Sequence, residues 1–409
     1  MKTAIIGGGA SGMIAAIVSA GYGDEVTVFE HMQRMGKKLL LTGSGKCNIS
    51  NTDTDLRHYH GGDMSVITSV LSACTPEMTR SFFEKLGLFM KDRNGYLYPY
   101  SEQASAVLDV LRFSIRDMGI DVSTETDVKS IRKEPSGEFT INTSQGRFIF
   151  DKIIMCTGSC AARNTGSDGS GYKLAASLGH TVIKPLPALT SLTCEEGFFP
   201  SIAGIRTKAN VSIYASSVNS GDMEMLGSET GELQLTKAGI SGIPVFNLSY
   251  LAIRAMDNGQ KVKGVIDLLP DVNKEDMNDF IRKRTGDNPE RCAEELLIGI
   301  LAKPLGICIC KRCGIDLKEK CSLLTDKEIG RIASMIKEFD AEVNGYGAFE
   351  NSQVVQGGVS LKEVKENLES RLVPGVYFAG ELLDVNGDCG GYNLQWAASS
   401  ATVAACGGR

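Results

Sequence analysis

The sequence predicts an α/β fold whose parallel sheet is divided in two by an inserted antiparallel domain. Short apolar runs that lead into small or polar turns occur at residues 3–6, 152–155 and 376–379, as in the parallel strands of nucleotide-binding sheets. Between the second and third of these runs, from about residue 191 to 346, short alternating segments give way to charged helices. The strands on either side of this insertion therefore belong to one discontinuous domain.

The first strand leads into a turn of the G-x-G-x-x-G type, which is followed by a helix of small apolar residues. The first glycine permits the tight turn, the second lets a pyrophosphate approach the backbone, and the third lets the helix pack closely on the strand. Free N–H groups at the start of the helix favour the phosphates. The residues predicted to line this turn are Gly7, Gly9, Ala10, Ser11 and Gly12.

A second predicted strand, residues 25–29, ends at Glu30. A carboxylate at this position can accept hydrogen bonds from the 2′- and 3′-hydroxyls of a ribose. A 2′-phosphate would face its negative charge, so the pattern predicts a dinucleotide with an unphosphorylated ribose, such as FAD or NAD. The strand, turn, helix and acidic strand end occur in order, which makes this signal more specific than the glycine pattern alone.

Composition narrows the class of partners. The chain has 409 residues, enough for two or three domains, and a formal net charge of −6. A nucleic-acid surface needs a basic face, so we expect no nucleic-acid partner. Glycines interrupt the apolar start, which makes it a poor export signal, and no apolar run is long enough to cross a bilayer. We therefore expect a cytoplasmic protein with no membrane partner and with reduced cysteines.

The next stretch, residues 36–51, reads GKKLLLTGSGKCNISN. Its three small residues at 43–45 let backbone N–H groups approach a ligand, and polar side chains follow at 46–48. A surface loop with a free thiol is the alternative. The stretch resembles the signature G-x-K-L-L-x-[ST]-G-x-G-R-C-N-x-[ST]-N of the BaiN-like family of bacterial NAD(P)/FAD-dependent oxidoreductases. These flavoproteins include aminoacetone oxidase and an enzyme of bile-acid 7α-dehydroxylation.

Two later stretches carry the same resemblance. KIIMCTG at 152–158 is similar to the A-T-G turn that closes on FAD, with Cys156 in place of alanine. AGELLDVNGDCGGYNLQ at 379–395 is similar to the family motif A-G-E-x-x-D-x-x-G-x-x-G-G-Y-N-L-Q. It opens a helix whose N-terminus favours negative charge, such as that of a reduced flavin. The resemblance covers essentially the whole chain and implies a two-dinucleotide-binding, Rossmann-like FAD domain.

The resemblance also implies further cofactor contacts. Val128 would offer its backbone to the adenine. The remaining implied FAD contacts are Lys38, Thr42, Gly43, Gly45, Cys47, Asn48, Thr157, Gly158, Gly380, Glu381, Asp384, Gly391, Tyr392, Asn393 and Leu394. The catalytic residues stay unknown, and the candidates near the flavin are Lys46, Cys47, Asn48 and Lys237. Lys46 stands where the family has arginine, which keeps the charge but loses the bidentate fork.

The connecting elements are predicted from periodicity and turn signals. An Asn94-Gly95 turn predicts a hairpin, and an amphipathic helix follows as far as Met118. Strands are expected at 120–123, 128–131, 139–143 and 148–150, and helices at 276–284, 290–300 and 326–339. In the insertion, alternating runs predict a small antiparallel sheet or barrel. There LTKAGISG resembles a family loop on the substrate side, with Lys237 in the position of a histidine. Lys237 either holds an anion or is a solvated lysine.

Two groups of residues have metal-ligand chemistry, but we predict no metal site. His58 and His60 lack a third ligand in the sequence. The other group, Cys308, Cys310, Cys313 and Cys321, has an atypical first spacing, and its thiols can serve as small apolar core residues. We predict four parts of the chain. They are 1–190 and 347–409 for the FAD domain, 191–270 with 325–346 for a substrate-side β domain, and 271–324 for a helical subdomain.

These features predict an FAD-dependent oxidoreductase. FAD can accept hydride at N5 from NAD(P)H and pass it on, and no second G-x-G-x-x-G unit is evident, so NAD(P)H would bind transiently. By resemblance, the expected reaction is reduction of a conjugated C=C bond in a small molecule such as a 3-oxo-Δ4 steroid or bile acid. An oxidase of a small amine that forms hydrogen peroxide, like aminoacetone oxidase, and a non-catalytic flavoprotein are the alternatives. Oligomeric state, substrate, and NADH against NADPH stay open.

Overall fold

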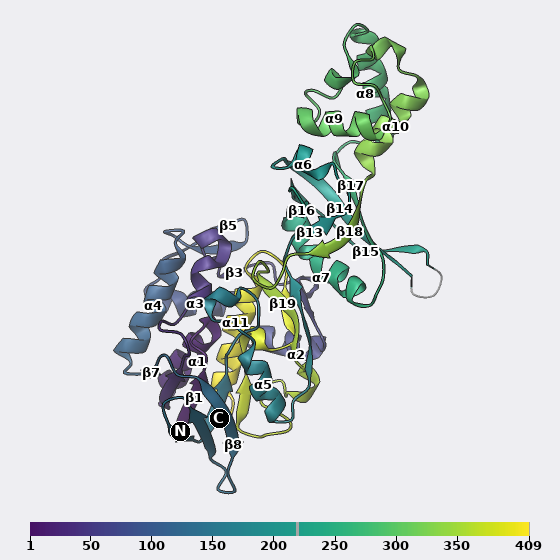
Figure 1. Cartoon of the computed structure of the whole chain (residues 1–409). Coiled ribbons are helices and arrows are strands. Elements are labelled where there is room, and N and C mark those ends of the chain that lie inside the picture. The colour runs from purple at the N-terminus through teal and green to yellow at the C-terminus, as the bar shows by residue number, and fades with distance from the viewer. Residues whose placement is uncertain (218–220, 409) are drawn as a thin grey trace. The chain divides into compact units, whose positions relative to one another are not determined.

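The computed structural model describes residues 1–217 and 221–408 and shows two compact units (Figure 1). The first unit combines Met1–Pro187 with Phe349–Arg409, and the second is the continuous segment Ala188–Ala348. The two ends of the chain therefore form one unit that is interrupted by an insertion.

The first unit is built on a five-stranded sheet with the order β20-β11-β1-β2-β7. Its strands are β1 (Lys2–Ile6), β2 (Glu25–Phe29), β7 (Asp121–Ser123), β11 (Lys152–Met155) and β20 (Val376–Phe378). Every neighbouring pair is parallel, and β1 occupies the middle position. The three predicted apolar runs are thus adjacent buried strands, and the predicted α/β fold class is confirmed.

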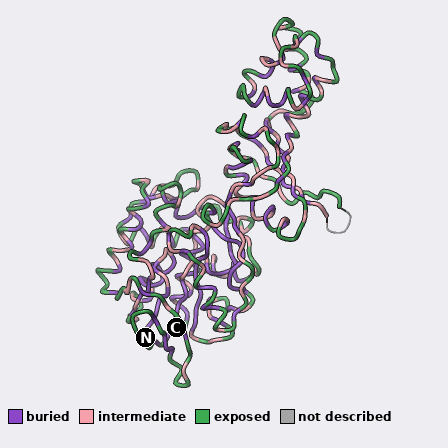
Figure 2. Tube along the Cα trace, in the orientation of Figure 1, coloured by how far each residue is buried: buried purple, intermediate pink, exposed green. Residues whose placement is uncertain are grey.

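Six α-helices of five or more residues are described in the first unit. They are α1 (Ala10–Gly21), α2 (Met64–Ala73), α3 (Pro76–Lys85), α4 (Ala104–Asp117), α5 (Ser170–Ser177) and α11 (Tyr392–Cys406). The helices α1 and α11 pack against each other, and the small side chains in both allow a close approach. Trp396 of α11 is buried, and its indole N–H donates to the Gly380 carbonyl at 3.1 Å. Figure 2 shows the buried residues of this unit gathered in its interior.

Smaller sheets complete the first unit. Their strands are β3 (Ser50–Asn51), β4 (Tyr59–Gly61), β5 (Met90–Arg93), β6 (Tyr96–Pro99), β8 (Val128–Lys133), β9 (Phe139–Thr143), β10 (Arg147–Phe150), β12 (Val182–Ala188), β19 (Val354–Val359) and β21 (Val385–Gly387). They pair as β10-β9-β8, β12-β19, β21-β4 and β3-β6-β5. The predicted hairpin is confirmed, because Asn94 and Gly95 both have positive φ between β5 and β6.

The second unit contains a closed antiparallel barrel with the order β13-β16-β15-β14-β17-β18. Its strands are β13 (Leu192–Cys194), β14 (Arg206–Ser216), β15 (Met223–Leu235), β16 (Gly239–Gly242), β17 (Val262–Asp267) and β18 (Phe339–Tyr346). The alternating runs of the insertion therefore form a barrel, with apolar side chains such as Val211 and Ile213 buried on one face of β14.

Helices account for the rest of the second unit. They are α6 (Phe199–Ile202), α7 (Ile243–Asp257), α8 (Lys274–Asp287), α9 (Lys303–Arg312) and α10 (Asp326–Lys337). The predicted helix at 290–300 is wrong: only a 3-10 turn, Ala293–Glu295, forms there. Gly299 with φ +88° and a bridge between Cys292 and Lys320 impose a turning path on this segment. Within 1–217 and 221–408, no helix combines the length and apolar character needed to span a bilayer.

The close contact of α1 with β1 gives a direct test of the fold. A Cβ added at Gly12 would lie 1.8 Å from the Gly7 carbonyl oxygen, whereas one added at Gly21, in the same helix, would meet nothing within 4 Å. We expect Gly12→Ala to destabilise the protein by about 1–3 kcal/mol. We expect Gly21→Ala to stabilise it by about 0.5–1 kcal/mol, because alanine loses less backbone entropy. Urea unfolding of both variants checks these signs, and equal stability of the two would contradict this account of the contact.

Candidate functional site

The turn after β1 leaves space in front of its second glycine. Gly7 has φ +103°, and a Cβ there would lie 2.5 Å from the Cys156 carbonyl oxygen. At Gly9 a Cβ would meet nothing within 4 Å. The helix α1 begins at Ala10 with no side-chain cap and no acidic residue in its first turn. The open side of the turn therefore presents uncapped N–H groups and the positive end of a helix dipole, which suits a pyrophosphate.

Glu30 is fixed at the end of β2 by backbone donors. One carboxylate oxygen accepts from the Gly8 N–H at 2.8 Å and the other from the Met32 N–H at 2.7 Å, and the residue is buried. Each carboxylate oxygen has a second lone pair. The side chain is thus held in place with acceptor capacity left for hydroxyl groups such as those of a ribose.

The loop of residues 42–48 is folded by left-handed backbone conformations. Gly43, Ser44, Gly45 and Cys47 all have positive φ, between 54° and 85°. The amide oxygen of Asn48 is buried and has no hydrogen-bond partner among the described residues. Because an unpaired buried acceptor is costly, this oxygen is a natural contact for a donor on a bound group.

The N-terminus of α11 meets this loop. Gly391 has φ +97° and caps the helix without a side-chain bond. A Cβ on Gly391 would lie 2.6 Å from the Ser50 carbonyl oxygen and 3.0 Å from the Asn48 amide oxygen. The Asn51 side-chain amide donates to the Gly390 carbonyl at 3.0 Å. Two motifs more than three hundred residues apart in the sequence therefore form one continuous surface.

Other predicted cofactor contacts partner each other or line the same region. Lys38 Nζ lies 2.6 Å from a carboxylate oxygen of Glu381, whose other oxygen accepts from the Val355 N–H at 3.2 Å. The Thr157 hydroxyl is buried with no partner among the described residues, and Asp384 is buried. The orphaned acceptors, the open turn and the uncapped helix ends together fit a bound dinucleotide such as FAD.

Three further predicted residues have the following surroundings within their own units. Lys46 is exposed and pairs with Glu102 at 3.2 Å. Lys237 is an exposed residue of the turn between β15 and β16 in the second unit. Val128 is half-buried at the start of β8. Lys46 thus has a carboxylate partner that the sequence did not indicate.

The two histidines hold a carboxylate that sequence reasoning missed. His58 Nδ1 lies 2.9 Å from one oxygen of Asp388, and His60 Nε2 lies 2.8 Å from the other. The His58 ring also stacks on Tyr392, with 4.4 Å between centroids. Asp388 occupies a variable position of the 379–395 motif, so only a pairing of β4 with β21 could have revealed it. No group of three or more metal-binding side chains occurs within 1–217 and 221–408.

Cys47 and the four clustered thiols of the insertion, Cys308, Cys310, Cys313 and Cys321, are buried. Burial raises the pKa of the Cys47 thiol to about 12, against a smaller opposing effect of a hydrogen bond with Thr42. Burial also raises the pKa of Cys310 to about 12 and the pKa values of Cys308, Cys313 and Cys321. These groups are therefore neutral near pH 7, and Cys47 is not a ready nucleophile.

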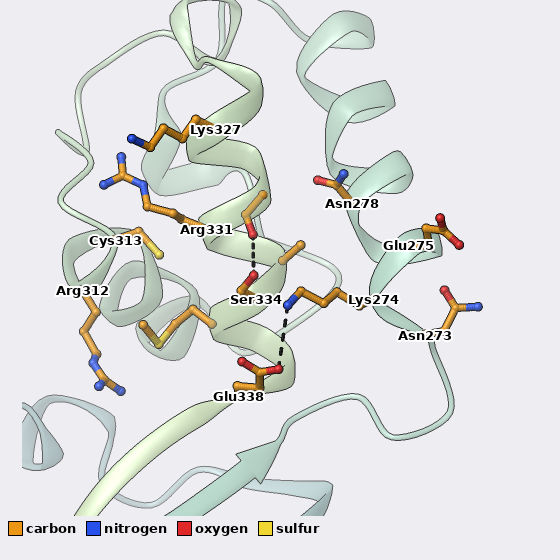
Figure 3. Close-up of a pocket in the computed structure, with 13 residues that line it drawn as sticks. Asn273, Lys274, Glu275, Asn278, Arg312, Cys313, Lys327, Arg331, Ser334 and Glu338 are labelled. Atoms are coloured by element: carbon orange, nitrogen blue, oxygen red, sulfur yellow. Dashed lines mark hydrogen bonds and ion pairs between the residues drawn. The ribbon is translucent and has the colours of Figure 1, made fainter.

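A separate pocket of about 900 Å³ lies between helices α8, α9 and α10 of the second unit (Figure 3). Lys274 points toward Glu338 at 3.8 Å. Arg331 also lines the pocket, and it pairs at 3.3 Å with Glu328, which does not. This pocket contains none of the residues predicted to contact FAD.

The raised pKa of Cys47 predicts its reactivity. At pH 8.5 about one Cys47 in a thousand or fewer should be thiolate, since the thiolate falls tenfold for each pH unit below the pKa. We expect iodoacetamide to leave Cys47 unmodified in the native protein and to label it fully in urea, as read by peptide mass spectrometry. Cys406, half-buried at the end of α11, is the internal control for labelling of native protein. Rapid native labelling of Cys47 would contradict the buried neutral thiol.

Comparison of the sequence with known proteins shows relatives that match nearly the whole chain. The chain is 37% identical over 406 residues to a 3-dehydro-bile acid Δ(4,6)-reductase of Clostridium scindens, covering 98% of each protein. It is 27% identical to ribosomal RNA dihydrouridine synthases of Haemophilus influenzae and Escherichia coli, covering 98% of this chain and 96% of each relative. Two relatives therefore modify RNA, and an acidic net charge does not support excluding nucleic acid.

Residues 1–407 match the family model described as the HI0933-like protein Rossmann domain. The match spans both units, and the relatives with reductase or synthase activity match along nearly their whole length. FAD is the cofactor that this flavoprotein family implies. The chain therefore belongs to the HI0933-like family, and it is an FAD-dependent oxidoreductase.

Proposed function

We propose that the protein reduces a conjugated C=C bond in a small molecule such as a 3-oxo-Δ4 steroid or bile acid, with NAD(P)H as electron donor. The observation that carries this proposal is the 37% identity to the bile acid Δ(4,6)-reductase, which extends over 98% of both chains. The shared length includes the insertion as well as the FAD unit, so the similarity is not confined to cofactor binding.

The first unit supplies the residues to hold the cofactor in this proposal. Uncapped N–H groups of α1 would bind the pyrophosphate, and Glu30 would accept from the ribose. The unpaired side-chain oxygens of Asn48 and Thr157 would accept hydrogen bonds from donor groups of the cofactor. The bound FAD supplies hydride transfer at N5.

The remaining site residues set the electrostatics. The N-terminus of α11 places the positive end of a 15-residue helix beside the Asn48 loop, where it favours developing negative charge. The ion pair of Lys38 with Glu381 bridges the two motifs and is internally neutral. Cys47 stays a neutral thiol, so its role in this proposal is packing and backbone contact instead of nucleophilic attack.

A second candidate function rests on the dihydrouridine synthases. Dihydrouridine is a uridine whose ring C=C bond has been reduced. The names of the dihydrouridine synthases and of the bile acid reductase therefore both describe reduction of a C=C bond. The 27% identity over nearly the whole chain favours RNA less strongly than the 37% identity favours a steroid-like substrate. The reaction class common to the two candidate functions is reduction of a C=C bond in a ring.

Gly9 tests the proposed cofactor site without disturbing the fold. Because a Cβ at Gly9 meets no protein atom within 4 Å, Gly9→Ala should unfold in urea like the wild-type apoprotein. The added methyl would occupy the space for the pyrophosphate, so we expect FAD affinity to fall about tenfold or more. Flavin absorbance of the purified protein and titration of the apoprotein with FAD measure this. Wild-type affinity in Gly9→Ala would show that FAD does not approach the backbone there.

The reaction is tested in two half-reactions. Anaerobic NADH or NADPH should bleach the oxidised flavin, and a 3-oxo-Δ4 steroid acid should restore it with a saturated product detectable by mass spectrometry. Ribosomal RNA lacking dihydrouridine is the parallel acceptor, and a saturated ketosteroid is the matched negative control. Reoxidation by the RNA alone would favour the second candidate. Anaerobic bleaching by a small amine and not by NAD(P)H, with hydrogen peroxide formed once oxygen is admitted, would contradict both candidate functions.

A further inference from the structure

The hairpin of β5 and β6 has one buried and one outward face. Met90, Leu97 and Pro99 are buried, whereas Lys91 and Tyr98 between them are only half-buried. The register pairs Lys91 with Tyr98 and Arg93 with Tyr96, so these four side chains share the outward face. Cations and aromatic rings therefore alternate on a single surface of the hairpin.

Three cations converge on one carboxylate beside this face. Glu102 lies 2.7 Å from Lys91 Nζ, 3.0 Å from an Arg93 guanidinium nitrogen and 3.2 Å from Lys46 Nζ. Glu102 adopts φ +52°, a left-handed conformation that is uncommon for glutamate. Hydrogen bonds from Lys91 and then Lys46 lower the pKa of Glu102 to about 2, so its charge persists at neutral pH. The cluster has an excess of two positive charges.

Exposed aromatic rings border the cluster. Phe89 is 72% exposed and Tyr100 is 60% exposed, and their ring centroids lie 5.1 Å apart. Lys91 Nζ lies 5.3 Å from the Tyr100 centroid, and the Arg93 guanidinium lies 5.9 Å from that of Tyr98. Large apolar rings left in solvent beside unbalanced cations suit a ligand that is both flat and anionic.

The cluster adjoins the loop proposed to contact FAD. Lys46 belongs to that loop, and the Tyr98 ring lies 3.9 Å from the Cβ position of Gly43. Ser50 and Asn51 pair with β6, so the same small sheet carries the end of the loop and the hairpin. A ligand on the hairpin face would therefore sit next to the loop, within one unit of the protein.

We propose that Lys46, Lys91 and Arg93 form a subsite for the anionic group of a reactant, with Glu102 as the internal counter-ion that the ligand displaces. The shared ligand chemistry is an anionic group joined to a ring system that can lie on aromatic side chains: a phosphate of NAD(P)H or the carboxylate of a steroid acid. This assignment rests on the proposed function. Glu102 holds the cations together before binding and competes with the ligand for them.

The test uses the FAD-loaded protein and opposite charge changes. Lys91→Gln/Arg93→Gln removes two cations, Glu102→Gln removes the competing carboxylate, and Lys46 is left intact because it lies in the proposed FAD loop. Arg132→Gln is the matched control, since Arg132 is an exposed arginine of β8 paired with Glu134. Calorimetry would measure binding of NADP⁺, NAD⁺, a steroid carboxylate and its methyl ester, with flavin content and thermal midpoint recorded for each variant.

The expected result is a pair of opposite effects on the anionic ligand. Its affinity should fall about tenfold or more in the double variant and rise about threefold or more in Glu102→Gln, and both effects should shrink in 0.5 M salt. The control variant and the methyl ester should be unaffected. An effect on NADP⁺ alone identifies the 2′-phosphate, an equal effect on NAD⁺ identifies the pyrophosphate, and an effect on the steroid acid identifies its carboxylate.

Three results would overturn the subsite. They are a loss of affinity in both Glu102→Gln and the double variant, unchanged affinities in both, and no binding of any anionic probe to the wild-type protein. If the double variant fails to fold, the Glu102→Gln variant is sufficient: a rise in affinity for the anionic ligand supports the subsite, and a fall or no change contradicts it. Binding is measured without turnover, so failure of enone reduction would contradict the proposed function while leaving the binding result readable.

Discussion

The contact between Gly12 and the Gly7 carbonyl is the constraint on which the FAD unit depends. It brings α1 directly onto the turn after the central strand, at a distance that a single Cβ would prevent. The start of α1 therefore points its N–H groups at the space in front of Gly9. Because α11 packs on α1 as well as on α2, this contact also helps to position the second helix. Both helix ends that favour negative charge are in this way set by backbone geometry.

The second requirement is that distant motifs meet without a covalent link. Lys38 and Glu381 form an ion pair across 343 residues, and the Ser50 hydroxyl donates to the Gln395 side chain at 2.6 Å. Asp388 is hydrogen-bonded to both His58 and His60, which holds β21 in place before the Gly390-Gly391 turn. These contacts are partly or fully buried, where removing one partner leaves an unsatisfied polar group. The insertion can therefore interrupt the chain while the cofactor surface stays whole.

The sequence predicted local features better than long-range pairings. Strands such as 25–29 and the turn at Asn94-Gly95 were predictable because period-2 burial and positive φ leave direct signals in residue type. The helix α7 was not predicted, although Pro244 stands in its first turn and its buried positions 245, 248, 252 and 253 have helical spacing, because the neighbouring runs alternate. The region of Gly299 lacks the helix that its charged residues suggested. Hydrophobic periodicity indicates the type of a single helix or strand and does not indicate which other element it packs against.

Partners across the fold were not predictable for the same reason. Asp388 with His58, and Glu102 with Lys46, lie far apart in the sequence and are joined only by strand pairing and loop conformation. The implied FAD contacts of the glycine-rich turns were local patterns, so they could be proposed residue by residue. The side chains around them depend on tertiary structure, which a single sequence does not state.

The residues proposed to hold FAD do not determine which substrate is reduced. Glycines, helix ends and one carboxylate suffice to hold a dinucleotide, and none of them distinguishes a steroid from a pyrimidine ring. Relatives that share this frame act on substrates as different as a bile acid and ribosomal RNA. Substrate choice must then come from side chains outside the frame. In the first unit the outward face of the β5–β6 hairpin is such a place, because its cations exceed its carboxylates and its rings are left in solvent. A surface of that kind has an electrostatic cost in the free protein, which a bound anion would remove.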